Sequence, residues 1–267
     1  MVNMEKNKVY CMDCKQGIKE LDKVHLVVTS PPYNIAKDYG TYKDNLDYWS
    51  YLDWLNEVWE LVYKKLVNGG YLCINVGNIF VSKKQNVHAK ETKIREILPT
   101  YAHTITNCMK IGFSFQEHFI WNKIGNSEDG KIVLGSYPYP VSVYSKAGLE
   151  HILVFKKGDY RDTKNKRTPE NKILWKDWNE YTKSVWTFSG ERMDKHCAPF
   201  PLELPRRLIR MYSFTNDIVL DPFMGSGTTA VASKELNRKF IGFEIDKKFC
   251  DMANKRASQR VVLWDWI

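Results

Sequence analysis

The spacing of apolar positions in the first part of the chain predicts a strand, an amphipathic helix and further strands. The run His25–Ser30 (HLVVTS) is rich in β-branched residues and is followed by two prolines, which indicates a buried strand ending in a loop. From Asp47 to Leu66 the apolar residues recur every three or four positions, which is helical spacing. Asp47 is a suitable N-terminal cap, and Asn68-Gly69-Gly70 marks the predicted end. Further buried strands are predicted at Tyr71–Val76, Phe115–Trp121 and His151–Phe155.

The carboxyl-terminal part of the sequence predicts one βαβ unit with a glycine-rich first turn. Asp217–Leu220 has the pattern of a strand, and DPFMGSGTT that of a turn into a helix ending at about Leu236. Lys239–Phe243 then predicts a second strand, followed by Glu244. Only 21 residues follow Asp246, enough for one more helix. The other strands must come from the amino-terminal half, so we expect an α/β fold whose mostly parallel sheet is circularly permuted relative to the usual nucleotide-binding order.

Composition and charge narrow the class of protein. A length of 267 residues suits one α/β domain with insertions. The chain is 43% hydrophobic and 27% charged, with a mean hydropathy of −0.45, which allows a sizeable core in a soluble protein. No apolar run approaches the ~18 residues of a membrane span, and the amino terminus lacks the apolar core of a secretory signal. We therefore expect a cytoplasmic protein without membrane contact. The formal charge of +9 favours a polyanionic partner such as nucleic acid.

The segment from Lys156 to Lys195 has no clear periodicity. It contains eleven Lys or Arg and seven Asp or Glu residues, a net charge of +4, interspersed with aromatic side chains. Composition leaves two interpretations open, a solvated irregular insertion or a nucleic-acid contact region of basic and aromatic residues. The aromatic residues are Trp175, Trp178, Tyr181, Trp186 and Phe188.

The glycine-rich turn indicates a site for an adenosine-type cofactor. Gly225-x-Gly227 lies where a strand turns into a helix, so a ligand can approach the backbone there. Glu244 ends the next strand, where a carboxylate can accept hydrogen bonds from ribose hydroxyls. The spacing up to Ala230 also fits a dinucleotide site, which keeps a nicotinamide cofactor open. No Walker motif occurs, which disfavours kinase or ATPase chemistry.

The segment Thr29–Asn34 (TSPPYN) predicts a rigid loop that can bind a planar ring carrying an amino group. Two prolines fix the backbone and leave carbonyls that we expect to point outward as acceptors. Ser30 adds a hydroxyl, and Tyr33 a flat aromatic face. If this strand joins the sheet of the βαβ unit, both loops lie at its carboxyl edge, where open α/β sheets bind ligands. The alternative is a plain Pro-Pro strand end.

Together these segments resemble an amino-methylating DNA methyltransferase. TSPPYN is followed about 190 residues later by DPFMGSGTT and then by FIGFEID. This order, with the catalytic loop first and the cofactor loop last, resembles that of the β group of the family. Flanking segments such as FSFQEHFIWNK and KHCAPFPLELPRRLI also match. The resemblance covers most of residues 9–80, 111–123 and 195–250.

The resemblance implies a domain organisation and partners. Residues 1–121 and 195–267 would form a Rossmann-like catalytic and cofactor-binding domain that uses S-adenosylmethionine. Residues 122–194, which include a returning strand near 151–155, would be a target-recognition insertion. Double-stranded DNA would be the substrate, in a restriction–modification system of a prokaryotic cell. A cognate restriction endonuclease and a homodimer are the further partners to be expected.

The resemblance also assigns roles to individual residues. Ser30 and the Pro31 carbonyl would accept hydrogen bonds from the exocyclic amino group of a base flipped out of the duplex, and Tyr33 would stack on that base. Pro32 completes this catalytic loop. The predicted cofactor-binding residues are Asp13, Asp221, Pro222, Phe223, Gly225, Ser226, Gly227, Thr228, Glu244, His196, Pro199 and Phe200.

Within this set, Glu244 is expected at the ribose hydroxyls and Asp13 at the adenine amino group. Asp221 and the glycine loop would surround the methionine end, and the segment from His196 to Phe200 would cover it. Cys197 departs from the family pattern, which has proline after the histidine.

The serine that opens the catalytic loop favours cytosine N4 as the methylated atom, because Asp or Asn at this position accompanies adenine N6 in the family. Adenine N6 is the alternative. A nicotinamide-dependent oxidoreductase would share Gly225 and Glu244 but has no use for TSPPYN. A non-catalytic DNA-binding module would need neither loop. An RNA or protein methyltransferase could use the same proline-lined pocket.

The cysteines and histidines do not predict a metal site. Cys11-x-x-Cys14 lacks the second pair that zinc requires, and the six cysteines are expected as reduced thiols. No Pro-Cys or His-x-Glu sequence occurs, which excludes cytosine-C5 methylation and zinc deaminase chemistry.

Overall fold

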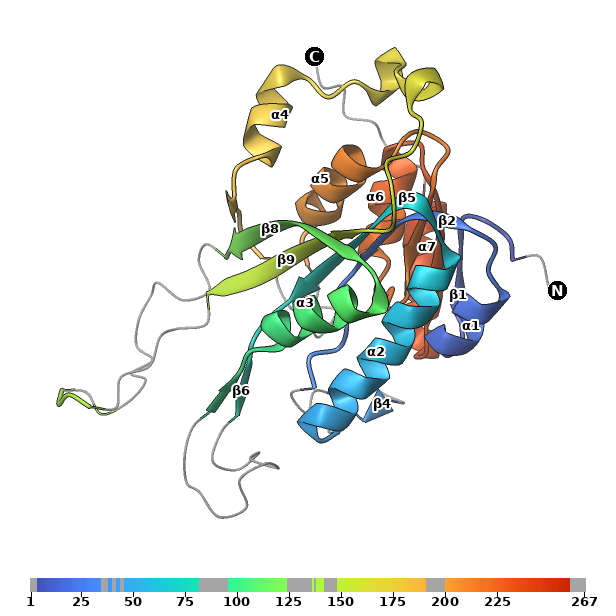
Figure 1. Cartoon of the computed structure of the whole chain (residues 1–267). Helices are drawn as coiled ribbons and strands as arrows, with labels where there is room; N and C mark the ends of the chain where they lie inside the picture. Colours follow the sequence, from blue (N-terminus) through green and yellow to red (C-terminus); the bar gives the residue numbers. More distant parts are fainter. Residues whose placement is uncertain are drawn as a thin grey trace.

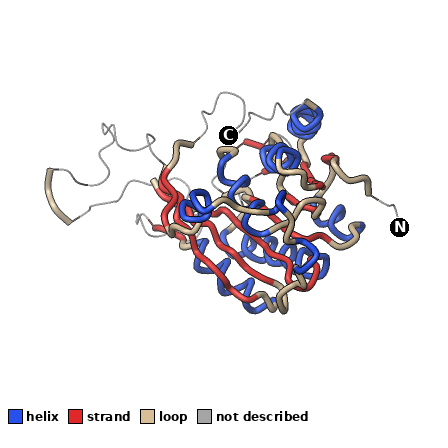
Figure 2. Tube along the Cα trace, turned by 90° about the horizontal axis from the view of Figure 1, so that it is seen from above, coloured by secondary structure: helices blue, strands red, loops and turns tan. Residues whose placement is uncertain are grey.

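The computed structural model describes residues 4–34, 38–39, 42–43, 46–81, 96–123, 136, 138–141, 148–190 and 200–259. An eight-stranded sheet lies between two layers of helices (Figures 1 and 2). Among its strands, β9 runs antiparallel to both neighbours and all other pairs are parallel. In order across the sheet, the strands are β1 (Lys8–Cys11), β12 (Lys239–Glu244), β11 (Ile218–Asp221), β2 (Val24–Thr29), β5 (Leu66–Val76), β9 (Leu149–Lys156), β8 (Ser114–Asn122) and β10 (Val185–Thr187).

Strands from the two ends of the chain lie side by side in this sheet. β12 and β11, from the carboxyl-terminal part, are inserted between β1 and β2, from the amino-terminal part. β1 pairs in parallel with β12, and β2 pairs in parallel with β11. The predicted α/β fold with a mostly parallel, circularly permuted sheet is therefore confirmed.

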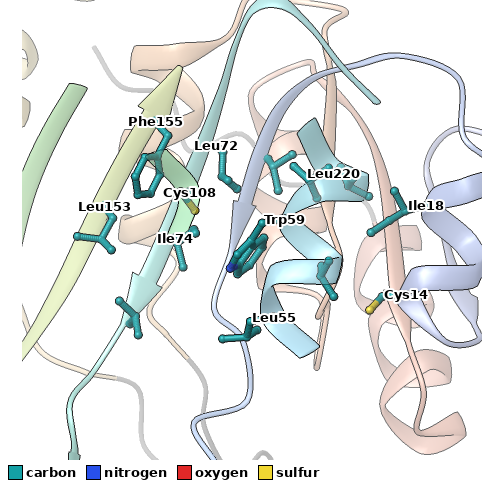
Figure 3. Packing of buried hydrophobic residues seen from close by; sticks show 14 of the residues in the cluster. Cys14, Ile18, Leu55, Trp59, Leu72, Ile74, Cys108, Leu153, Phe155 and Leu220 are labelled. Atoms are coloured by element: carbon teal, nitrogen blue, oxygen red, sulfur yellow. The ribbon is translucent and has the colours of Figure 1, made fainter. Parts of the chain in front are cut away.

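Side chains alternate between the two faces of the sheet, and different helices cover each face. On one face Leu72, Ile74 and Leu220 pack against a layer that contains Trp59 (Figure 3). That layer consists of α1 (Cys14–Glu20), α2 (Tyr48–Lys65) and α3 (Thr100–Ile111). The opposite layer consists of α5 (Glu203–Tyr212), α6 (Thr228–Glu235) and α7 (Lys247–Ser258) (Figure 1). No helix in the described ranges is long and apolar enough to cross a membrane.

Helix α2 confirms the predicted periodic segment and its cap. The Asp47 carboxylate accepts hydrogen bonds from the backbone N–H groups of Trp49 and Ser50. The predicted end is wrong by a few residues, because the helix stops at Lys65 and β5 begins at once. The glycine pair therefore lies inside the strand. There Gly70 allows a close approach, since a Cβ atom would lie 2.8 Å from the carbonyl oxygen of His25.

The smaller elements flank the main sheet. Two two-stranded sheets and two short 3-10 turns occur in the described residues, besides one short helix near β10. They are β3 (Asp38–Tyr39) with β4 (Tyr42–Lys43), β6 (Ile79–Val81) with β7 (Glu96–Leu98), η1 (Lys164–Lys166), η2 (Pro169–Asn171) and α4 (Trp175–Tyr181).

The aromatic residues of the basic segment divide into core and surface. Trp186 is 1% exposed, because β10 forms a short edge strand beside β8. The indole ring of Trp186 stacks on the Phe119 ring, with 4.7 Å between the ring centres. Trp175 is 78% exposed, on α4. The interpretation of all these aromatics as nucleic-acid contacts is therefore wrong for Trp186, which fills the core. Tyr181 is also buried.

Candidate active site

The proline loop and the glycine loop leave neighbouring parallel strands at the same edge of the sheet. In the β2–β11 pair, Val27 lies beside Leu220, so the two strands end at the same level. The Thr29 hydroxyl at the end of β2 donates a hydrogen bond of 2.6 Å to the Asp221 carboxylate at the end of β11. The two predicted loops therefore lie side by side at the carboxyl edge of the sheet, the edge where open α/β sheets bind ligands.

The Asp221 carboxylate is hydrogen-bonded to residues of both loops. Its Oδ1 accepts hydrogen bonds from the Thr29 hydroxyl and, at 3.0 Å, from the backbone N–H of Phe223. Its Oδ2 accepts from the Thr229 hydroxyl at 2.7 Å. Burial raises the pKa of Asp221 to about 6, while the hydroxyl donors favour the charged form. The observed contacts of this carboxylate fix the loops, and its predicted contact with the cofactor stays a prediction.

The glycine loop turns through two residues with left-handed backbone. Gly225 has φ 52° and Gly227 has φ 91°. A Cβ atom at Gly227 would lie 2.8 Å from the Cα of Ala253 in α7, so only glycine fits there. Arg256 of α7 donates to the backbone carbonyl and the hydroxyl of Ser226, at 2.9 and 2.8 Å. The loop is therefore held against α7 before Thr228 starts α6.

Two acids lie at the adjacent ends of β1 and β12. The Glu244 carboxylate accepts one hydrogen bond from the backbone N–H of Gly225 at 2.8 Å and one from that of Asp246 at 2.9 Å. Burial raises the pKa of Glu244 above its usual value. Asp13 caps α1, because its carboxylate accepts hydrogen bonds from two backbone N–H groups. It lies two residues after Cys11, the residue of β1 that lies beside Glu244 in the sheet. The fold thus brings both predicted acids to one end of the glycine loop.

The other predicted cofactor residues are placed less uniformly. Pro222 is buried, and Phe223 is partly buried with its ring 5.5 Å from that of Trp54 on α2. Phe200 is also partly buried, in the hydrophobic cluster on the α5 and α6 face of the sheet. Outside the described residues lie His196, Cys197 and Pro199.

The proline loop is held by hydrogen bonds at Pro32 and at Asn34. The Tyr51 hydroxyl of α2 donates a 2.8 Å hydrogen bond to the Pro32 carbonyl. The Asn34 amide exchanges two hydrogen bonds with the backbone of Leu46, at 2.7 and 2.9 Å. The expectation that the proline carbonyls point outward is therefore wrong for Pro32, whose carbonyl is used within the protein.

The Tyr33 hydroxyl is the centre of a polar cluster. It accepts hydrogen bonds from the Ser30 hydroxyl at 3.2 Å and from the Asn75 amide at 3.1 Å, and it donates to Glu150 Oε2 at 3.0 Å. Burial and the neighbouring charge of Glu150 hold the pKa of Tyr33 well above its usual value, so it stays a phenol. The ring lies over Gly77, where a Cβ atom would come within 3.3 Å of it.

Lys123 completes this cluster. Its ammonium group forms an ion pair with Glu150 Oε1 and lies 4.8 Å from the ring centre of Trp121. The sequence analysis missed Asn75, Glu150 and Lys123. The sequence indicates these residues only by their polarity near the ends of buried strands. Asn75 interrupts the apolar run of β5, and Glu150 precedes that of β9.

Comparison with known proteins identifies the family. The family described as DNA methylase, N6_N4_Mtase, matches residues 24–255, most of the chain. The chain belongs to this DNA methylase family. The resemblance predicted from the sequence motifs is confirmed, and with it the coarse activity of an amino-methylating DNA methyltransferase.

Individual relatives agree with this assignment. The DNA methylase is 34% identical to the Type II methyltransferase M.MjaI of Methanocaldococcus jannaschii, over 85% of this chain and 83% of the relative. It is 33% identical, with a TM-score of 0.73, to TTHA0409 of Thermus thermophilus in complex with S-adenosyl-L-methionine, over 94% and 92% of the two chains. The cytosine-N4-specific PvuII DNA methyltransferase shares the fold, at 20% identity and a TM-score of 0.69, over 98% and 89%.

Proposed function

We propose that this DNA methylase transfers a methyl group from S-adenosylmethionine to the exocyclic N4 atom of a cytosine flipped out of duplex DNA. The observation that carries the proposal is the 2.6 Å hydrogen bond between Thr29 and Asp221. This bond ties a loop of acceptors for an amino group to a loop suited to the cofactor. Ser30 at the start of the acceptor loop supports cytosine over adenine.

The residues at the glycine loop fit the cofactor. Each oxygen of the Glu244 carboxylate accepts one backbone N–H, which leaves lone pairs for two ribose hydroxyl donors. Asp13 lies beside it with a carboxylate that suits an amino donor. The left-handed turn at Gly225 presents backbone to the ligand without a side chain, while Gly227 lets the loop pack closely on α7. S-adenosylmethionine, when bound, supplies an electrophilic methyl group on a sulfonium.

The chain's own residues act on the base. The amino nitrogen of cytosine is a weak nucleophile, because its lone pair is delocalised into the ring. Ser30 and the Pro31 carbonyl accept hydrogen bonds from its N–H groups and favour a tetrahedral nitrogen. Positioning and electrostatic stabilisation then account for the rate enhancement. Tyr33 stacks on the extruded ring, a contact worth ~1–3 kcal/mol. Its own ring is kept in place by Gly77 and by its bonded hydroxyl.

We assign DNA binding to the insertion at about 122–194 and to the basic character of the chain. The formal charge of +9 suits a phosphate backbone. On α4, Trp175 and Trp178 are exposed beside lysines, which is the combination of stacking and charge that binds nucleic acid. The Asp177–Arg210 ion pair of 3.1 Å attaches this helix to α5.

The biological setting follows from the same assignment. We propose a role in restriction–modification in the prokaryotic cytoplasm, with a cognate endonuclease that cuts the same site when it is unmethylated. The Type II designation of M.MjaI supports this setting. A homodimer is the proposed assembly, as in the β group that the motif order resembles.

The test is methyl transfer from labelled S-adenosylmethionine to unmodified genomic DNA, followed by nucleoside mass spectrometry and sequencing of the modified sites. We expect N4-methylcytosine at one short recognition sequence, and its loss in Tyr33→Ala. Tyr63→Phe is a matched control, because it removes a hydroxyl that lies beside Gly112 and away from both loops. N6-methyladenine would overturn the choice of base alone. Transfer only to RNA or protein would overturn DNA as the substrate.

A further inference from the structure

Asn75 lies in the middle of the proposed active site, one strand away from the catalytic loop. In the parallel pair of β2 and β5, Thr29 lies beside Ile74, so Ser30, which directly follows β2, and Asn75 of β5 are the next residues along the two segments. The Asn75 side chain is 2% exposed. A buried amide at the end of an otherwise apolar strand requires partners, because an unpaired buried polar group costs free energy.

The two ends of this amide are in different situations. Asn75 Nδ2 donates to Glu150 Oε2 at 2.6 Å and to the Tyr33 hydroxyl at 3.1 Å. Asn75 Oδ1 is buried and has no hydrogen-bond donor among the residues that the structure describes. An amide rotated by 180° would place Oδ1 against the carboxylate of Glu150, which only accepts. The chemistry of Glu150 therefore fixes which end of Asn75 is left without a partner.

Glu150 is itself held firmly. It is buried at the start of β9 and forms an ion pair with Lys123, which follows β8. The ammonium group offsets the cost of burying this carboxylate, and Glu150 in turn orients Asn75 and Tyr33. The result is an acceptor oxygen held in place on the residue of β5 that lies next to Ser30 in the strand register.

We propose that the Asn75 carbonyl oxygen accepts a hydrogen bond from the exocyclic amino group of the target base, and that Glu150 is the positioning residue that holds it there. This inference rests on the proposed function. The amino group has two hydrogens, so Asn75 Oδ1 and the Ser30 hydroxyl share one of them in a three-centre hydrogen bond, and the Pro31 carbonyl accepts the other. A carbonyl acceptor selects an amino group and rejects the O4 carbonyl of thymine, because two acceptors would then face each other with no hydrogen between them.

The test measures the coupling between Asn75 and the amino group. Binding is measured for a duplex that carries the target base and for one in which the base lacks only that group, pyrimidin-2-one for cytosine or purine for adenine. The ratio of the two dissociation constants is compared between the wild type and Asn75→Ala. The two duplexes differ in the free energy needed to flip the base. This difference is the same for both proteins, so it cancels when their ratios are compared. We expect the ratio to change by about tenfold, the worth of one buried hydrogen bond.

A second variant separates an acceptor from a structural role. Asn75→Ala removes the acceptor. Asn75→Asp combined with Glu150→Gln keeps an oxygen at the Oδ1 position and exchanges the amide and the carboxylate, so that a donor still faces an acceptor. We expect this double variant to retain most of the coupling and Asn75→Ala to lose it. Equal ratios for the wild type and Asn75→Ala, or equal losses in both variants, would overturn the proposal. Glu150→Gln is expected to weaken the coupling, and an undiminished value would overturn its positioning role.

Controls separate this result from misfolding and from failure of the proposed function. Thr104→Ala removes a different buried polar group, a hydroxyl that donates to the Thr100 carbonyl in α3, and should leave the coupling unchanged. Cofactor affinity and thermal unfolding are measured for each variant. Absence of methyl transfer to DNA by the wild type would refute the proposed function, whereas an active wild type with the wrong ratios refutes this inference alone.

Discussion

Asp221 offers a direct test of how the two loops are joined, because its charge is costly where it lies. The carboxylate is 1% exposed, and burial raises its pKa to about 6 from an ordinary value of 3.8. At ~1.4 kcal/mol for each pH unit, this difference corresponds to about 3 kcal/mol. The three hydrogen bonds to Asp221 therefore compensate only part of the cost of burying its charge.

The direction of the effect follows from proton binding. Between pH 3.8 and 6 the folded protein holds a proton on Asp221 that the unfolded chain has released, so stability falls as the pH rises through this window. Above pH 6 the full cost is present. Asp221→Asn keeps the shape without the charge. Its oxygen still accepts from Thr29, and its amide N–H can donate to the Thr229 hydroxyl, which in the wild type donates to Asp221. We expect this variant to be more stable than the wild type by up to about 3 kcal/mol at pH 8 and by little at pH 4.

The assay is urea unfolding followed by tryptophan fluorescence at several values of pH between 4 and 8. The difference in free energy of unfolding between the two proteins isolates Asp221, because all other groups titrate in both. Asp251→Asn is the control, since Asp251 forms an exposed ion pair with Lys247 and should change stability little at any pH. A difference between Asp221→Asn and the wild type that does not vary with pH would refute the reasoning.

Three further predictions test the glycine loop and the divided aromatic segment. Gly227→Ala places a methyl group against Ala253 in a left-handed backbone, so we expect a loss of about 1–3 kcal/mol in urea unfolding and loss of cofactor binding in calorimetry. Trp186→Ala empties a core site and should cost about 3–5 kcal/mol, whereas Trp175→Ala should leave stability unchanged and weaken DNA binding in gel-shift titrations. Glu244→Gln should raise the dissociation constant for S-adenosylmethionine about tenfold, through the lost charge-assisted bonds, without changing DNA affinity.

Long segments with their own periodicity were predictable from the sequence, and short ones were not. Helix α2 spans 18 residues and carries its own cap at Asp47, so its local pattern is sufficient. Strand β10 has three residues and exists because β8 lies beside it. Trp186 and Trp175 occur in the same basic segment, and only the position of β10 buries one of them. Composition describes such a segment as a whole and does not distinguish its members.

The proline loop and the glycine loop were predictable because each is a contiguous motif. The Thr29–Asp221 contact could be inferred in outline, from two strands that must share a sheet. Two partners of the Tyr33 hydroxyl, Asn75 and Glu150, could not be inferred, because they come from two further strands, β5 and β9, whose order is set by the whole fold. Tyr51 lies in the segment whose apolar spacing predicts a helix, and that spacing does not indicate that its hydroxyl donates to the Pro32 carbonyl.

The antiparallel strand explains why Glu150 in particular escaped prediction. In a parallel sheet, residues at the ends of strands meet at the ligand-binding edge, so a search of the sequence favours positions after each apolar run. β9 runs the other way between β5 and β8, and its first residues therefore lie at that same edge. Glu150 precedes its strand's apolar run and still meets Asn75 near the end of β5 and Lys123 after β8. A single reversed strand thus brings an acid to the proposed base pocket from a position that the parallel rule assigns to the opposite edge.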